Sequence, residues 1–326
     1  MSQKRSVGLE STTLARYQSI FDCHVIPAFG KKKAKELRQS DLSGQYAEWA
    51  QNGSNGRGIS GRTIRHVHET LRNVLHYGAR NDYVTRNVAA LVSKDDLPKV
   101  IQPKPKAMTE QELARVLTEA KSPTSRAKKR GYLSSQPWFY PAVFFGAYTG
   151  CRRGEICALR WEDVNFEEGT VTISRSVTER LEFKTTKNDK VEAITMEADL
   201  AAVLKAHRAA QAKERLFLGP AYNDQGLVFA HADGSPVKPW NFGRAVKDLV
   251  HRTGGTSITL HGLRRTHASL LSEQGVPIEV IRKRLRHSNI AVTMRYLDIG
   301  RDREAAAAGA FERLMRGESR SHVTQM

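Results

Sequence analysis

The stretch "LHGLRRTHASLLSEQGVPIEVIRKRLRHSNIAVTMRY", residues 260–296, holds a single tyrosine, Tyr296, nine positions after His287 in a polar, arginine-rich helical pattern. A tyrosine on a helix is most often a packing residue. It can act as a nucleophile only where other residues supply what a phenol lacks, because a pKa of about 10 keeps it protonated at neutral pH. The rest of the chain has to decide between these two interpretations.

The composition predicts a two-domain protein with a polyanionic partner. The chain has 326 residues, of which 40% are hydrophobic, enough for folded cores. Its formal net charge is +18, and lysine and arginine that neutralise phosphates release condensed counterions. Charge alone leaves DNA, RNA, anionic proteins and an anionic membrane surface open.

Three features predict a cytoplasmic protein without a membrane partner. No segment approaches the roughly 20 apolar residues that span a bilayer. The start, "MSQKRSVGLE", lacks the apolar stretch of a signal peptide. Cys23, Cys151 and Cys157 form no CxxC pair and no disulfide framework, which suits a reducing compartment.

The first part of the chain is predicted to be a small helical domain. Apolar residues recur at helical spacing in "TTLARYQSIFDCHVI", in "KKKAKELRQSDLSGQYAEWA" and in "SGRTIRHVHETLRNVLHYGARND". The last stretch places five apolar residues on one side, namely Ile64, Val67, Leu71, Val74 and Leu75. Pro27, Gly30 and the loop "QNGSNGRGISG" separate the helices, and no segment here predicts a strand.

The segment "KDDLPKVIQPKPKAM" is predicted to be a linker because it combines three prolines with mixed charge. We expect a helical DNA-binding domain over 8–95, the linker over 96–107, a second domain with a C-terminal helix over 108–316, and a tail over 317–326. The second domain opens with a helix whose Thr109 and Glu112 have the spacing of a capping box.

The second domain is predicted to be mainly helical with a small sheet. "PWFYPAVFFGAYTG" predicts a buried helix, and "LAAVLKAHRAAQ" and "NFGRAVKDLVHR" predict two more. "GTVTISRSV" alternates Val171 and Ile173 with polar residues, as a half-buried strand does. "LEFKTTKNDKVEAITM" predicts a hairpin with its tip at Asn188-Asp189. The fold class is thus mainly α with a small β-sheet.

Four stretches carry residues suited to phosphate chemistry. In "TGCRRGEICALRW", a glycine turn before Arg152 can aim a guanidinium at an anion, although a surface ion pair with Glu155 is the simpler interpretation of this stretch alone. In "LHGLRRTH", His261 and Arg264 share a helix face, where a solvated basic face is the alternative. The third is the tyrosine stretch quoted above. The fourth is the lysine-rich hairpin, where lysines usually keep a sheet edge soluble.

The order and spacing of these stretches resemble the tyrosine recombinase family, the integrases of phages and mobile elements. "TGCRRGEICALRW" is similar to the family's first arginine box, and "HGLRRTHASLLSEQGVPIEVIRKRLRHSNIAVTMRY" to its second. The helical first half, from "TLARYQSIFDCHVIPAFG" to "VTRNVAALV", resembles the family's SAM-like core-binding domain. The resemblance implies an α-helical core-binding domain, an α+β catalytic domain and site-specific recombination of DNA in the integration or excision of a mobile element.

Carried over position by position, the resemblance implies a catalytic set of Arg152, Lys187, His261, Arg264, His287 and Tyr296, with Glu155 supporting the first arginine. The two arginines would clamp the non-bridging phosphate oxygens and stabilise the charge of the transition state. His261 would be the base toward Tyr296, and His287 a further donor to the phosphate. The lysine would protonate the leaving 5′ oxygen while Tyr296 becomes a covalent 3′-phosphotyrosine.

Two positions depart from the family pattern or leave it open. The family has glycine before the second histidine, where this chain has Arg286, which would shift the His287 loop or add a phosphate contact. Counting back from Ile194 favours Lys187 as the general acid, with Lys184 as its rival. No cofactor is implied, and the sequence has no HExxH motif or carboxylate cluster with evident metal spacing.

Further basic residues are candidates for DNA contacts, namely Lys31, Lys32, Lys33, Arg62, Arg65 and Arg286. A solvated lysine run and solvent-facing arginines at a helix start are the alternatives. The expected partners are double-stranded DNA, further copies of the chain in a homo-tetramer on paired DNA sites, and accessory DNA-bending or excision proteins, in a nucleoid-associated location. The alanine-rich "REAAAAGAFERLM" would pack on a neighbouring protomer or within its own chain.

Two rival functions stay open at this point. One is a non-catalytic DNA-binding regulator that shares the fold, and the other is a type IB topoisomerase-like enzyme that relaxes DNA. Formation of a covalent adduct separates an enzyme from the regulator. Strand exchange between two duplexes separates a recombinase from the topoisomerase. The core-binding pattern begins near Ser11, so an additional N-terminal domain for arm-type sites is not expected.

Overall fold

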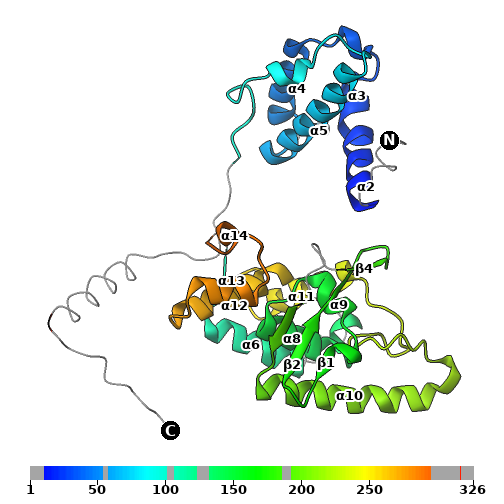
Figure 1. The fold of residues 1–326 in the computed structure, drawn as a ribbon, viewed down its shortest axis with the longest axis vertical. Helices are drawn as coiled ribbons and strands as arrows, with labels where there is room; N and C mark the ends of the chain where they lie inside the picture. Colours follow the sequence, from blue (N-terminus) through cyan, green and yellow to red (C-terminus); the bar gives the residue numbers. More distant parts are fainter. Residues whose placement is uncertain are drawn as a thin grey trace. The chain divides into compact units, whose positions relative to one another are not determined.

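The fold is described by a computed structural model over residues 11–53, 58–100, 106–122, 132–185 and 192–294, together with Arg316. The chain divides into two compact units, Met1–Pro103 and Lys104–Met326 (Figure 1). Within the described residues the first unit is helical, and the second combines helices with short antiparallel strands. The predicted fold class, mainly α with a small β-sheet, is confirmed.

The first unit packs its helices around one apolar core. Its elements are α2 (Ser11–Ile20), a π-helical turn (Phe21–Val25), α3 (Ile26–Phe29), α4 (Gln39–Gln51), α5 (Gly61–Arg80) and 3-10 turns at Ala34–Glu36 and Val88–Leu91. Leu42 and Tyr46 of α4 and Ile64 of α5 are completely buried in this core. The hydroxyl of Tyr46 lies 3.3 Å from Nδ1 of His68, so its polar end is paired inside the core.

The long helix α5 shows why the sequence pattern predicts this unit well. Ser60 starts the helix, because its hydroxyl accepts a hydrogen bond from the Thr63 N–H at 3.2 Å. Four of the five residues predicted on its apolar side are buried, namely Ile64, Val67, Leu71 and Leu75. The fifth prediction is wrong, since Val74 falls at the edge of the buried stripe and is 38% exposed.

The second unit is built around helix α8. Its helices are α6 (Glu110–Lys121), α8 (Phe139–Thr149), α9 (Arg153–Ala158), α10 (Ala198–Leu218), α11 (Pro239–Arg252), α12 (Leu260–Glu273), α13 (Ile278–Arg284) and α14 (Ile290–Met294). The sequence of α8 is apolar on all sides, and α6, α10 and α12 pack against it (Figure 1). The predictions of a buried helix here and of helices at α10 and α11 are confirmed.

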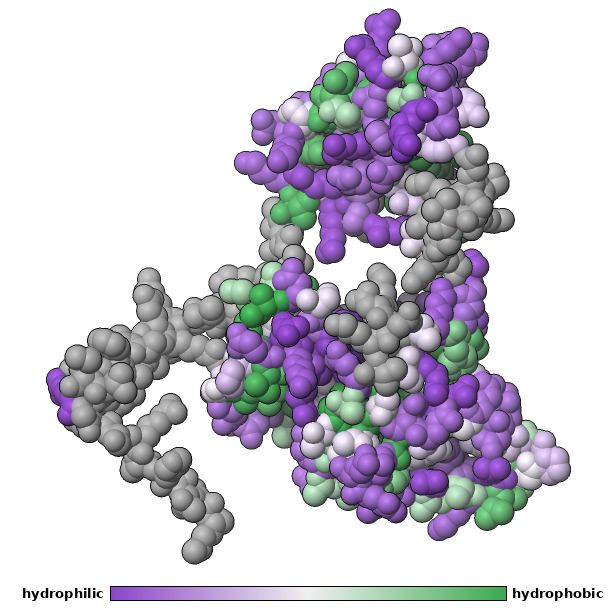
Figure 2. Space-filling view, viewed as in Figure 1, coloured by the Kyte–Doolittle hydropathy of each residue, from purple (hydrophilic) through white to green (hydrophobic). Residues whose placement is uncertain are grey.

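The apolar residues of both units lie mostly in these cores. On the face drawn in Figure 2, hydrophilic residues dominate the surface of each unit, and hydrophobic residues appear in small patches. Within the described ranges, no helix combines the length and the apolar character that crossing a bilayer requires.

The described strands form two small antiparallel sheets. β1 (Val164–Asn165), β2 (Thr170–Ile173) and β5 (Glu192–Thr195) lie in the order β1-β2-β5, and β3 (Arg175–Val177) pairs with β4 (Phe183–Thr185). Val171 and Ile173 of β2 face the core and are buried, so the predicted half-buried strand is confirmed.

The hairpin predicted over residues 181–196 is wrong in its pairing. β4 and β5 do not pair with each other, because β4 pairs with β3 and β5 pairs with β2. The chain leaves the first pairing after Thr185 and joins the second at Glu192. The predicted tip at residues 188–189 falls between these points and lies outside the described residues.

A turn that joins two paired strands in this part of the chain lies between β3 and β4. The Thr178 N–H donates to the carbonyl of Glu182 at 3.0 Å, and Leu181 takes a left-handed φ of 62° inside the turn. Left-handed turn positions usually hold glycine or asparagine. Because leucine occupies this one, the sequence gives no turn signal here.

The predicted capping box at the start of α6 is confirmed. The Thr109 hydroxyl accepts from the Glu112 N–H at 3.2 Å, and the Glu112 carboxylate accepts from the Thr109 N–H at 2.9 Å. The second oxygen of Glu112 accepts from the N–H of Thr256 at 2.7 Å and from its hydroxyl at 2.9 Å. One carboxylate therefore starts α6 and ties it to the loop before α12.

His267 of α12 lies at the junction between α8 and α13. Its Nδ1 is 3.0 Å from the carbonyl of Ala147, and its Nε2 accepts from Nε of Arg284 at 3.2 Å. Arg284 also binds the carbonyl of Tyr148 and the carboxylate of Glu197. These bonds require a neutral ring with its proton on Nδ1. Burial and the charge of Arg284 accordingly lower the pKa of His267 to about 4.

Lowering the pH from 7 to 5 should destabilise the second unit in part through His267. An unfolded histidine, with a pKa of about 6.5, takes up a proton in this window, whereas the folded ring stays neutral, so acid favours unfolding. In His267→Gln the amide can still donate to Ala147 and accept from Arg284, but it cannot titrate. We expect this variant to lose about 1–2 kcal/mol less unfolding free energy than the unaltered chain between pH 7 and pH 5. Identical pH dependence in denaturant titrations would contradict this assignment.

Candidate active site

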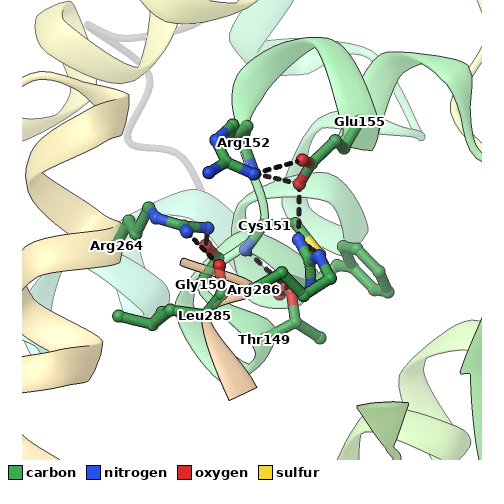
Figure 3. Close-up of polar contacts among 9 residues, drawn as sticks. Thr149, Gly150, Cys151, Arg152, Glu155, Arg264, Leu285 and Arg286 are labelled. Atoms are coloured by element: carbon green, nitrogen blue, oxygen red, sulfur yellow. Dashed lines mark hydrogen bonds and ion pairs between the residues drawn. The ribbon is translucent and has the colours of Figure 1, made fainter. Parts of the chain in front are cut away.

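The turn after α8 sets the position of the first candidate arginine. Gly150 takes a left-handed φ of 62° and ends α8 (Figure 3). The Thr149 hydroxyl accepts from the N–H of Cys151 at 3.3 Å and holds the turn. Arg152 is the N-cap residue of α9, and its side chain is 48% exposed. The chain thus presents a guanidinium to solvent three residues after the buried end of α8.

Glu155 orients this guanidinium from the first turn of α9. Its two oxygens accept from the backbone N–H of Arg152 at 2.7 Å and from Nη1 of Arg152 at 2.8 Å. Nη2 of Arg286 binds the same carboxylate from another side (Figure 3). Burial would raise the pKa of Glu155, but the charges of Arg286 and Arg152 outweigh this effect and lower it. Glu155 is therefore ionised at neutral pH although its side chain is only 4% exposed.

Arg264 of α12 is buried, unlike the solvated basic face that its spacing also allowed. Its Nη1 donates to the carbonyl of Gly150 at 2.6 Å, and its Nη2 donates to the carbonyl of Leu285. Burial and the charge of Arg152 lower its pKa to about 10, which still leaves it charged at neutral pH. Two carbonyls from separate stretches thus fix one buried guanidinium (Figure 3).

His261 lies one turn before Arg264 on α12 and remains accessible to solvent. Partial burial and the charges of Arg265, Arg264 and Arg152 lower its pKa to about 4. The ring is therefore neutral at pH 7 and able to accept a proton.

His287 follows α13 and is buried. Its Nδ1 lies 2.9 Å from the hydroxyl of Thr293 on α14, and its carbonyl accepts from Nη1 of Arg282 at 2.9 Å. Burial, then the charges of Arg264 and Arg152, lower its pKa to about 3. If Thr293 donates to Nδ1, the proton of the neutral ring is on Nε2, where it can be donated to a ligand.

The structure does not describe the two remaining residues of the predicted catalytic set, the lysine and the tyrosine. Lys187 and Tyr296 lie outside the described residues. Lys184, the alternative general acid, lies on β4, and its ammonium is 4.0 Å from the carboxylate of Glu182. The structure thus brings together Arg152, Glu155, His261, Arg264 and His287, and leaves the lysine and the tyrosine as predictions.

The candidate DNA-contacting residues differ in their exposure and in their contacts within the protein. Lys31, Lys33 and Arg62 are exposed. Lys32 is also exposed but pairs with Asp41 at 2.7 Å. Nε of Arg65 donates to the carbonyl of Pro98 at 3.0 Å, so this arginine ties α5 to the segment around Pro98.

Arg286 differs from these surface residues, because its side chain is only 7% exposed. Its guanidinium is turned inward against Glu155 and Cys151. In this conformation it is not presented to a DNA phosphate, which is the contact that the sequence suggested for it.

Several residues that build the site carried no signal in the sequence. The carbonyls of Gly150 and Leu285 are the acceptors for the buried arginine, and any residue type supplies a carbonyl. Thr293 fixes the ring of His287 from a short helix whose role the spacing did not indicate. Among the described residues, no group of three or more histidine, cysteine and acidic side chains is arranged to hold a metal ion.

Two sequence-family models match the chain. The Phage integrase family matches residues 106–302, and the "Phage integrase, N-terminal SAM-like domain" matches residues 3–50. Since the first match covers more than half of the chain, the chain belongs to the phage integrase family. The predicted class, a tyrosine-type site-specific DNA recombinase, is confirmed at this level.

Related proteins agree with this assignment. The integrase of Streptomyces ambofaciens is 29% identical over 300 residues, which cover 88% of this chain and 71% of that protein. A XerC-like tyrosine recombinase of Caldanaerobacter subterraneus subsp. tengcongensis is 28% identical over 255 residues, covering 73% of this chain and 62% of that protein. Neither the regulator nor the topoisomerase interpretation gains support from these relatives.

Solved structures share the fold. The Tn1549 transposon integrase in complex with transposon right end DNA has a TM-score of 0.76 at 18% identity, covering 96% of this chain and 97% of that one. The lambda integrase tetramer bound to a Holliday junction has a TM-score of 0.66 at 16% identity, covering 91% and 74%. This likeness supports the predicted pairing of a SAM-like domain with a recombinase catalytic fold.

Substituting Gly150 should destabilise the site strongly. In Gly150→Ala the new Cβ would lie 2.6 Å from Leu285 and 3.1 Å from His267, in addition to the left-handed backbone. Gly275→Ala is the matched control, because its φ is also positive, at 78°, but nothing lies within 4 Å of the added Cβ. We expect the control to lose about 1 kcal/mol of unfolding free energy and Gly150→Ala about 1–3 kcal/mol more. Equal losses in denaturant unfolding would show that the turn can expand.

Proposed function

We propose that the chain cuts and rejoins double-stranded DNA through a covalent 3′-phosphotyrosine on Tyr296, in the integration or excision of a mobile element. One observation carries this proposal: Arg264 donates to the carbonyls of Gly150 and Leu285, so the turns that lead into Arg152 and His287 are held against the helix that carries His261 and Arg264. The charges of Arg152 and Arg264 accordingly lower the pKa of both histidines. A phosphodiester resists attack because its anionic oxygens repel a nucleophile. A fixed group of cations and neutral imidazoles is what such a reaction needs.

The two arginines bind the non-bridging oxygens of the scissile phosphate. The carbonyls of Gly150 and Leu285 orient Arg264, and the carboxylate of Glu155 orients Arg152. Donors that are oriented before the substrate binds stabilise the transition-state charge without reorganising during the reaction. The exposure of Arg152 supports this role, since DNA can reach it.

His261 accepts the proton of the Tyr296 hydroxyl. Its low pKa supports a neutral ring in the free protein, and part of that low value comes from the neighbouring arginines. A bound phosphate offsets the arginine charges and raises the pKa of His261 toward the range in which a base is effective. His287 donates a hydrogen bond from Nε2 to the phosphate while Thr293 holds Nδ1.

The cleavage step forms the bond from the Tyr296 oxygen to phosphorus and breaks the bond from phosphorus to the 5′ oxygen. The phenolic proton goes to His261, and the 5′ oxygen takes a proton from Lys187, with Lys184 as the alternative. Attack by a 5′-hydroxyl on the phosphotyrosine reverses the step, so joining needs no ATP. Exchange of partners between two cleaved duplexes then gives recombination.

The assembly and the domain boundaries are part of the proposal. The first unit, with a core-binding domain over 8–95, and the catalytic domain over 108–316 clamp one DNA site, with the linker over 96–107 and a tail over 317–326. The division of the chain at Pro103 supports the linker. Four copies act on paired sites with accessory DNA-bending or excision proteins in the nucleoid, and the tetrameric state of lambda integrase on a Holliday junction supports this arrangement.

A nicked DNA substrate tests the covalent intermediate. Its sequence is taken from direct repeats sought in the DNA around the gene. The substrate loses a short 5′-hydroxyl fragment on cleavage, so rejoining lacks a partner and the adduct accumulates. We expect Tyr296→Phe to form no adduct yet to bind DNA normally, because only one oxygen is removed. Arg152→Ala should bind DNA but form the adduct about 10²- to 10³-fold more slowly.

Tyr148→Phe is the matched tyrosine control. Its ring stacks on Phe144 at a centroid distance of 4.1 Å, and we place it in packing rather than chemistry. Its adduct yield should equal that of the unaltered chain. Mass spectrometry that finds the nucleotide on any residue other than Tyr296 would overturn the mechanism.

The general acid is tested with DNA that carries sulfur in place of the leaving 5′ oxygen. A thiolate leaving group needs no proton, so this substrate should restore cleavage to the variant that lacks the acid. We expect Lys187→Ala to be slow on ordinary DNA and restored on the sulfur-containing DNA, and Lys184→Ala to be little affected on either. Restoration of Lys184→Ala instead would assign the role to Lys184.

A further inference from the structure

Arg286 occupies a backbone position that normally favours glycine. Its φ is 54°, in the left-handed region, where a side chain is strained. The turn after α13 fixes this conformation, because the Arg286 N–H donates to the carbonyl of Lys283 at 2.9 Å and the His287 N–H donates to that of Arg282 at 3.1 Å. Arginine therefore occupies a position where glycine would have less backbone strain.

The side chain of Arg286 is buried against the carboxylate that orients Arg152. Nη2 of Arg286 binds Oε2 of Glu155 and lies 3.4 Å from Sγ of Cys151. The same Oε2 accepts from the backbone N–H of Arg152, and Oε1 accepts from its guanidinium. Figure 3 shows the two arginines reaching Glu155 from different sides.

This arrangement determines the net charge that the group around Arg152 presents to a phosphate. One buried carboxylate faces two guanidiniums, so the group of three carries a net positive charge. Without Arg286, Glu155 and Arg152 would form a neutral ion pair with much weaker attraction for a phosphate. The lowered pKa of Glu155 supports its ionised state, with the charge of Arg286 as the largest favourable cause.

We propose that Arg286 is a positioning residue that neutralises Glu155, so that Arg152 is oriented by this carboxylate yet keeps its positive charge for the scissile phosphate. The proposal rests on the proposed function, because it concerns the same cleavage step. Arg286 itself does not touch the DNA in this scheme. The competing role is a direct phosphate contact, for which its guanidinium would have to leave Glu155 and the protein interior.

Two substitutions of Arg286 distinguish the effect of its backbone conformation from the effect of its charge. Arg286→Gly removes the guanidinium and suits the left-handed backbone, so the turn should remain folded. Arg286→Lys keeps a positive charge that can reach Glu155. Lys283→Ala, at an exposed position of α13, controls for the loss of one positive charge from the protein as a whole.

The first measurement is the rate of adduct formation on the nicked substrate. We expect Arg286→Gly to be about tenfold to a hundredfold slower than the unaltered chain, Arg286→Lys to recover most of the rate, and Lys283→Ala to be unchanged. Non-covalent DNA affinity, measured with Tyr296→Phe as the parent, should be nearly the same with and without Arg286→Gly. A weaker affinity whose salt slope falls by about one would instead indicate a direct phosphate contact and overturn the proposal.

A methylphosphonate at the cleavage position gives the second measurement. This group lacks one negative oxygen, so its transition state depends less on the charge of Arg152. The rate difference between the unaltered chain and Arg286→Gly should therefore shrink to within about threefold. An undiminished difference would mean that Arg286 acts only on the shape of the site, and that would overturn the charge role.

Failure of this inference is distinct from failure of the proposed function. If the unaltered chain forms an adduct on Tyr296 and Arg286→Gly forms it equally fast, the inference alone falls. If the unaltered chain forms no adduct, both fall together. If Arg286→Gly unfolds, Arg286→Lys decides the matter, since a folded lysine variant as slow as Arg152→Ala would overturn a role based on charge.

Discussion

One buried guanidinium connects the separate parts of this site. Arg264 donates to the carbonyls of Gly150 and Leu285, and each of these residues lies two positions before a candidate catalytic residue, Arg152 in one case and His287 in the other. A buried charge that lost these partners would cost several kcal/mol. The two turns must therefore stay against α12, and the places of Arg152 and His287 follow from the hydrogen bonds of Arg264.

The charge balance around Arg264 has a second consequence. Arg152 and Arg286 bind a single carboxylate, Glu155, and the buried Arg264 adds a third positive charge nearby. The lowered pKa values of the histidines keep these rings neutral. The site thus holds surplus positive charge in a partly desolvated place, which is unfavourable for the free protein. The same surplus attracts an anion, and a bound phosphate would relieve the repulsion that the fold has to tolerate.

The helices were predictable from the sequence because their signals are local. The apolar pattern of α8 and the capping box of Thr109 and Glu112 need only nearby residues. The strand pairing was not predictable, because β4 and β5 sit close together in the sequence but pair with different strands. The turn at Leu181 also lacks the glycine or asparagine that usually marks a left-handed position.

The candidate site, like the fold, has features that the sequence indicates and features that depend on long-range contacts. The resemblance to a known family, which the order and spacing of the motifs carry, indicated which arginines and histidines belong together. It did not indicate that Arg264 would be buried or that Arg286 would turn away from solvent, because both outcomes depend on partners more than a hundred residues distant, at Gly150 and Glu155. From the sequence, an arginine beside the candidate catalytic histidine His287 suggests a phosphate contact. In the fold, Arg286 binds a carboxylate of its own chain, Glu155, which also binds the guanidinium of Arg152.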